Sequence, residues 1–197
     1  MKNKLPLHRW VFLGINLLLV LAVVFFVTHR HSFIFRFPGL ASKNYGKVPS
    51  FNLIDRSGRA VSDSDLKDRV WVADFIFTRC ADQCPVMTQK ASTLSRKMKD
   101  VQWVSFSVDP AYDSPSVLKD YAEKFGADRT RWFFLTGKKE VMNRVAQGFH
   151  VSDTEHPMFH NISFILVDRE GRIRGYYDSS DPEKIKQLEH DAKALLA

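Results

Sequence analysis

The chain has 197 residues, with 29 Lys and Arg against 22 Asp and Glu, and a formal net charge of +7. This charge is confined to one end, because residues 1–50 contain seven basic residues and no acidic residue, while residues 51–197 contain 22 of each sign. A nucleic-acid-binding domain would carry the basic excess on its own surface, so this distribution excludes nucleic acid as a partner.

An apolar segment lies near the N-terminus, where residues 10–27 read WVFLGINLLLVLAVVFFV without a charge. A helix of this length spans about 27 Å, close to the hydrocarbon thickness of a bilayer. We therefore expect a short tail over residues 1–9, a transmembrane anchor over 10–28, a juxtamembrane linker over 29–48 and one folded domain over 49–197.

Basic residues before the apolar segment set the expected orientation. Lys2, Lys4 and Arg9 favour a cytoplasmic N-terminus, which places the folded domain on the periplasmic face of a bacterial inner membrane. A mitochondrial protein would be expected to carry an Arg-rich, Ser-rich presequence before the apolar segment, and the sequence shows none there, so we favour the bacterial membrane. The alternative is a cleaved signal peptide, but the small residues at 39–41 lie well beyond the apolar run, which argues against cleavage there.

The folded domain alternates short apolar runs with amphipathic stretches, a pattern typical of α/β proteins. The predicted elements are a hairpin over 51–62, a buried strand over 70–77, a helix over 85–99, a strand over 101–108, a helix over 116–126, a strand over 132–135, a helix over 138–149, a hairpin over 162–177 and a C-terminal helix over 181–196. Pro in a first turn marks the starts of the helices at 85 and 181, and Gly126 marks a helix end.

The two cysteines of the chain, Cys80 and Cys84, lie in FTRCADQCPVMT at residues 77–88. The predicted elements place them between the carboxyl end of a strand and the start of a helix, where open α/β sheets carry their sites and where a helix dipole favours a thiolate. Residues four apart in a helical turn lie about 6 Å apart and share a face. The pair could therefore form a disulfide or chelate one metal ion, and the alternative is two buried apolar side chains.

Histidine is the natural third ligand beside two thiolates. His160 stands immediately before a predicted strand, which could bring it to the cysteines, and His150 and His156 are weaker candidates. The remaining histidines flank the apolar segment or lie in the C-terminal helix, and are most simply solvated or interfacial: His8, His29, His31 and His190.

Three motifs in this order resemble those of the Sco/SenC family of membrane-anchored, thioredoxin-fold copper proteins. FTRCADQCP resembles the family's FTxCPxxCP, VDPAYDSP resembles its VDPxRDTP, and HNISFILVDREGRI resembles its His-bearing segment before the last hairpin. The resemblance covers the chain from about Pro49 to its end. It implies a thioredoxin-like α/β fold, with a central mixed sheet flanked by helices.

The resemblance also implies copper, as Cu(I) or Cu(II), bound by Cys80, Cys84 and His160. The function implied is that of a metallochaperone for the binuclear copper centre of cytochrome c oxidase, with the copper-bearing oxidase subunit as partner and a copper donor protein upstream. Two soft thiolates and an imidazole suit Cu(I), and the thiols could also be oxidised to a disulfide.

The chain departs from the family pattern at three positions. Ala81 replaces the Pro after the first cysteine, Tyr112 replaces the Arg of the aspartate loop, and Phe159 replaces the Asp before the His. All three predicted ligands are retained, so the changes concern the partner surface and the tuning of the site.

Asp74 favours a second function, thiol-disulfide exchange with the cysteines of an exported protein. It lies six residues before Cys80, the offset of the buried Asp that moves protons in thioredoxins, and a buried charge needs a task or a partner. Cys80 would attack and Cys84 would resolve. The structural alternative pairs Asp74 with a Lys or places it at an exposed strand edge.

Two further interpretations concern a structural zinc site and the two aspartates of the VDPAYDSP loop. Cys80, Cys84, His156 and His160 have the ligand count of a closed structural zinc site, which would make the domain an inert binding module. Asp109 and Asp113 most simply cap the next helix or fix the turn, and the resemblance suggests that Asp109 borders the copper site without binding the metal.

Overall fold

The structure is a computed structural model that describes residues 43–151 and 162–197. The predicted anchor lies outside these residues, and so does the segment with His156 and His160. Among the described residues, no helix combines the length and the apolar character needed to cross a membrane.

A mixed β-sheet forms the centre of the described part of the chain. Its seven strands are ordered β2-β1-β5-β4-β3-β6-β7. In chain order they are β1 (Asn52–Asp55), β2 (Ala60–Ser62), β3 (Trp71–Ile76), β4 (Gln102–Ser107), β5 (Trp132–Thr136), β6 (Ser163–Val167) and β7 (Ile173–Asp178). The β3–β4 and β4–β5 pairs are parallel, and the other pairs are antiparallel. The predicted fold class, a central mixed sheet flanked by helices, is confirmed.

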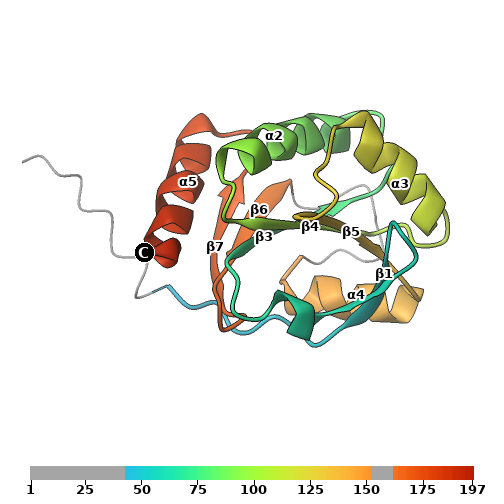
Figure 1. Cartoon of the computed structure of the whole chain (residues 1–197), viewed down its shortest axis with the longest axis horizontal. Helices are drawn as coiled ribbons and strands as arrows, with labels where there is room; N and C mark the ends of the chain where they lie inside the picture. The colour runs from blue at the N-terminus through green and yellow to red at the C-terminus, as the bar shows by residue number, and fades with distance from the viewer. Residues whose placement is uncertain (1–42, 152–161) are drawn as a thin grey trace, which may run out of the picture. The chain divides into compact units, whose positions relative to one another are not determined.

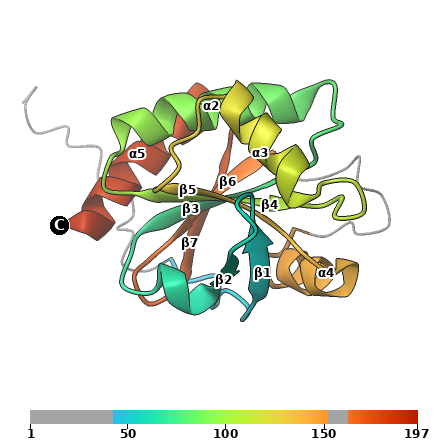
Figure 2. The ribbon, with the colours of Figure 1, turned by 45° about the vertical axis from the view of Figure 1, so that its right-hand side comes forward.

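Helices cover both faces of this sheet. The described helices are α2 (Gln83–Lys97), α3 (Pro115–Lys124), α4 (Lys139–Gly148), α5 (Pro182–Leu196) and the short 3-10 helix η2 (Asp63–Leu66). Figures 1 and 2 show α2 and α3 on one side of the sheet and α4 on the other. The buried side chains of α5 join those of α2 and α3 in one cluster, so α5 belongs to the same layer.

The core accordingly has two layers, separated by the sheet. Along β3, Val72 and Ile76 pack in the α2 layer, while Trp71, Ala73 and Phe75 pack in the α4 layer. This alternation is what a strand covered on both faces requires, and it places Asp74 on the α2 side.

Helix ends explain the small differences from the predicted bounds. Helix α2 begins at Gln83, two residues before the predicted start, so Cys84 lies in its first turn. Helix α3 ends at Lys124, and Gly126 follows with φ +62°, a conformation that glycine adopts without strain. The amide of Ala127 then donates to the carbonyl of Ala122 at 3.0 Å, closing the helix as predicted.

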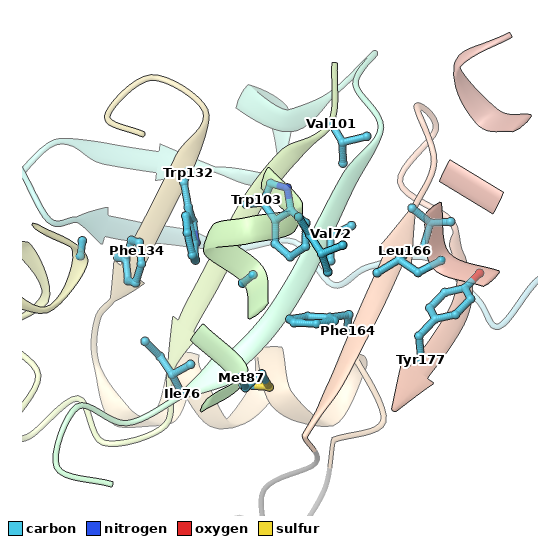
Figure 3. Packing of buried hydrophobic residues seen from close by; sticks show 14 of the residues in the cluster. Val72, Ile76, Met87, Val101, Trp103, Trp132, Phe134, Phe164, Leu166 and Tyr177 are labelled. Carbon is cyan, nitrogen blue, oxygen red and sulfur yellow. The ribbon is translucent and has the colours of Figure 1, made fainter. Parts of the chain in front are cut away.

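The α2 layer generates a test of stability, because its tryptophans are equally buried but differently bonded. The Trp103 ring lies 6.0 Å from the Trp132 ring and 5.4 Å from the Phe164 ring (Figure 3). Its indole N–H has no partner among the described residues, whereas Trp132 donates to the Ser105 hydroxyl at 2.9 Å.

We expect Trp103→Ala to lower the free energy of unfolding by about 3–5 kcal/mol and Trp103→Phe by about 1–2 kcal/mol, because the Phe ring keeps most of the packing. Trp132→Phe should cost roughly 1 kcal/mol more than Trp103→Phe, since it also removes a satisfied hydrogen bond. Urea titrations of the three variants measure this, and a Trp132→Phe variant that is the more stable of the two Phe variants contradicts it.

Candidate thiol and metal site

Cys80 and Cys84 lie together at the carboxyl end of β3. Cys80 belongs to the turn that leaves the strand, where its amide donates to the carbonyl of Phe77 at 3.2 Å. Cys84 is the second residue of α2, and its amide donates to the Cys80 sulfur at 3.4 Å. The expected juxtaposition of the two thiols at a strand-helix junction is therefore present, and no disulfide joins them in this structure.

The two thiols differ in burial, and their pKa values are shifted in opposite directions. Cys84 is completely buried, and burial is the main cause that raises its pKa far above the ordinary thiol value. Cys80 is partly exposed. Burial also works against its thiolate, but the amides of Cys84, Asp82 and Gln83 and the Cys84 thiol together outweigh this effect and lower the Cys80 pKa. Cys80 is therefore the thiol of the pair that ionises more readily, and Cys84 is the one that keeps its proton more strongly.

Asp74 is a buried carboxyl group on β3, on the side of the sheet where Cys84 also packs. It is 1% exposed on a strand that has neighbours on both sides, and neither of its oxygens has a hydrogen-bond partner among the described residues. The alternative expectations, a Lys partner or an exposed edge, are therefore wrong.

The environment of Asp74 also sets its protonation. Burial raises the Asp74 pKa to about 7. The Ser105 hydroxyl, opposite Asp74 on β4, acts in the lowering direction but forms no hydrogen bond of normal geometry with the carboxylate. The Asp74 charge in turn contributes to the raised Cys84 pKa, so the two groups interact.

Asp113 ties the cysteine turn to the neighbouring loop. This fully buried carboxylate accepts hydrogen bonds from the Thr78 hydroxyl at 2.5 Å, from the Thr78 amide at 3.3 Å and from the Ser107 hydroxyl at 2.6 Å. The expected helix cap is wrong for Asp113, because the Ser114 hydroxyl accepts from the Val117 amide and caps α3. Sequence reasoning missed this role, since Asp113 and Thr78 are 35 residues apart.

Asp109 lies on the other side of the same turn. Its carboxylate pairs with the Arg79 guanidinium, next to Cys80, while its backbone carbonyl accepts from the amides of Tyr112 and Asp113. Arg79 also stacks over the Tyr112 ring at 4.6 Å. Tyr112 thus has a partner in Arg79, the residue next to Cys80. That Asp109 borders a copper site stays a prediction, and its ion pair with Arg79 is consistent with it.

The candidate histidines are not brought to the cysteines by the described residues. His160 and His156 lie outside them, and the ligand role of His160 stays a prediction. His150 follows α4, on the opposite side of the sheet from α2, and its ring contacts the Tyr45 carbonyl at 3.3 Å. Within residues 43–151 and 162–197, no three His, Cys, Asp or Glu side chains form a metal-binding group.

Comparison with known proteins shows the family of the chain. The family model described as SCO1/SenC matches residues 41–197. The SCO1 protein homolog of Bacillus subtilis (strain 168) is 34% identical over 161 residues, which are 77% of this chain and 83% of the relative.

Solved structures of Sco proteins share the fold. BsSco, described as a Sco-family cytochrome c oxidase assembly protein with a disulfide switch, is 34% identical with a TM-score of 0.66, and the match covers 77% of this chain and 95% of BsSco. Copper-bound ScoI of Bradyrhizobium japonicum is 26% identical with a TM-score of 0.63, covering 74% of this chain and 99% of ScoI. On this evidence, the chain is a member of the SCO1/SenC family.

Proposed function

We propose that this protein is a membrane-anchored copper metallochaperone that delivers copper to the binuclear centre of cytochrome c oxidase. Cys80, Cys84 and His160 are the proposed ligands. The observation that carries the proposal is the unequal thiol pair, in which Cys80 is partly exposed with a lowered pKa and Cys84 is buried with a raised pKa. The copper-bound state of a related ScoI supports copper as the cargo.

The donor set suits a soft metal ion that must later leave. Two sulfurs favour Cu(I) over hard cations, and the same ligands accept Cu(II). Because metal binding requires thiolates, copper would displace the proton of Cys84, so uptake releases protons and strengthens as pH rises. The exposed Cys80 is the ligand that an acceptor's own thiols could replace, whereas Cys84 is shielded.

The proposed setting follows from the apolar segment at residues 10–27. An uncleaved anchor would hold the domain at the periplasmic face of the inner membrane, where the copper-bearing oxidase subunit is the proposed recipient and a donor protein could load the site. The basic residues around the anchor suit anionic lipid head groups.

A second candidate function, thiol-disulfide exchange, is favoured by the buried Asp74. The Cys80 thiolate would attack one sulfur of a target disulfide, which breaks the S–S bond, forms a mixed disulfide with Cys80 and releases the target's first thiolate, which takes up a proton. Asp74 would take the Cys84 proton, and the Cys84 thiolate would then displace the target's second thiolate, which takes up a proton. The target is thereby reduced by two electrons, and Cys80 and Cys84 are left as a disulfide. The closed zinc site is the third candidate, and a partly exposed Cys80 argues against it.

His160→Ala should weaken Cu(I) binding by roughly hundredfold or more, because it removes one of three proposed ligands. An anaerobic titration of the reduced protein against a competing Cu(I) chelator measures this, with one copper per chain expected for the wild type. His190→Ala is the matched control, since that ring is exposed on α5 and pairs with Asp191. Equal affinities of wild type and His160→Ala would remove His160 from the site.

The unequal thiols predict selective alkylation. At neutral pH, iodoacetamide should modify Cys80 at least tenfold faster than Cys84, since alkylation requires an accessible thiolate. Peptide mapping by mass spectrometry assigns the modified residue, and the pH at half-maximal rate should lie below the ordinary thiol pKa for Cys80. In urea both thiols should react alike. Faster modification of Cys84 in the folded protein would contradict the geometry.

Asp74 predicts a pH dependence of stability. A raised carboxyl pKa means that the folded state keeps a proton that the unfolded state loses, so the free energy of unfolding should fall as pH rises from about 4 to about 7. Asp74→Asn should remove this component and stabilise the protein above pH 7, by at most about 4 kcal/mol.

The same variant separates the two functions. If the protein is a thiol reductase, Asp74→Asn should slow the reduction of a disulfide-bonded test protein such as insulin about tenfold or more, because the resolving thiol loses its proton acceptor. If it is only a metallochaperone, Cu(I) affinity should be retained and reductase activity should be absent in both proteins.

A further inference from the structure

A groove lies outside the thiol site, beside α3. It is a cavity of about 620 Å³ between the turn that joins β1 to β2, the helix α3 and the residues before β5. Its wall carries the side chains of Arg56, Arg59, Lys119 and Arg129, from three separate segments of the chain. We call the cavity lined by these four residues the basic groove.

The acidic groups of the same wall leave this positive charge only partly compensated. Asp55 accepts from the Ser57 amide and hydroxyl and from the Arg59 amide, and it pairs with the Arg59 guanidinium at 3.3 Å. Glu123 pairs with Arg129 at 2.8 Å. Two carboxylates thus face four cations, and Lys119 forms no ion pair with any described residue.

Arg56 carries the clearest sign of a missing partner. Its Nη2 donates to the Asp128 carbonyl at 2.9 Å and its guanidinium lies over the Phe134 ring at 5.3 Å, while its Nη1 is buried without a partner among the described residues. Burial, followed by repulsion from Arg129, lowers the Arg56 pKa, although the carboxylates of Asp55, Glu123 and Asp128 act in the raising direction. Two guanidinium groups therefore repel each other across the groove, and a buried N–H donor is unsatisfied, which an anion would remedy.

We propose that the basic groove binds the phosphate group of an organic phosphate. A phosphate offers several acceptor oxygens to donors that approach from different segments, whereas a carboxylate offers two in one plane. A second cavity of about 400 Å³ shares Arg59, Arg129 and Phe133 with the first, and both Arg69 and Asp65 line it, so there is room beside the groove for the organic part of the ligand. The phosphate could belong to a soluble metabolite or to a lipid head group.

The test uses the full chain in a neutral detergent, at constant ionic strength set with chloride. Isothermal titration with glycerol phosphate probes a soluble phosphate, and titration with dihexanoyl phosphatidylglycerol below its micelle concentration probes a lipid head group. We expect one ligand per chain, with the dissociation constant raised about tenfold by Lys119→Gln and by Arg129→Gln, since each removes a charge-assisted contact. Both side chains are exposed, so neither change should unfold the domain.

Lys184→Gln is the matched control, because Lys184 is an exposed lysine on α5 outside the groove. Binding of glycerol phosphate supports a soluble ligand, and binding of the phosphatidylglycerol alone supports a lipid head group. The proposal is overturned if neither probe binds, if Lys184→Gln weakens binding as much as Lys119→Gln, or if an acidic peptide of equal charge competes as well as the phosphates. Copper binding at Cys80 and Cys84 is measured in the same variants and should be unchanged.

Discussion

The burial of β3 on both faces is the constraint on which the site depends. Strand β3 pairs with β4 and β6 and is covered by α2 on one face and α4 on the other. The chain that leaves β3 therefore becomes accessible to solvent only after the carboxyl end of the strand, at this edge of the sheet. Cys80 lies in the turn at that edge, and Cys84 lies in the first turn of the helix that covers the strand. Asp113 then holds the turn through Thr78, so the position of Cys80 is set by a strand, a helix and a buried carboxylate together.

This placement makes two chemically identical side chains unequal. Cys80 receives amide hydrogen bonds at the surface and favours the thiolate, while Cys84 lies in the apolar α2 layer and favours the thiol. An unequal pair suits both proposed functions. In copper transfer one sulfur is exchangeable and the other is shielded, and in thiol exchange one sulfur attacks while the other waits for its proton to be removed.

Asp74 distinguishes these functions because a stability argument alone does not account for it. A buried carboxyl group without a hydrogen bond destabilises the folded domain, and an apolar residue would fit a strand packed between two layers better. Asp74 interacts with Cys84 and could therefore accept its proton. When Asp74 is charged, however, it raises the pKa of Cys84 and so disfavours the Cys84 thiolate. The basic groove beside α3 is likewise not accounted for by stability, since four cations line it and the Arg56 Nη1 is buried without a partner among the described residues.

The sequence by itself determined the order and type of the elements, because alternating apolar residues, prolines at helix starts and Gly126 at a helix end act over a few residues. It also predicted that the two cysteines lie together at a strand-helix junction, since their spacing and this junction are local features. Only the tertiary structure decided that Asp74 has no hydrogen-bond partner among the described residues, that Asp113 bonds Thr78 rather than capping α3, and that four cations meet at one groove. These depend on residues far apart in the chain, whose contacts are set by how the strands are ordered and how the helices pack on them.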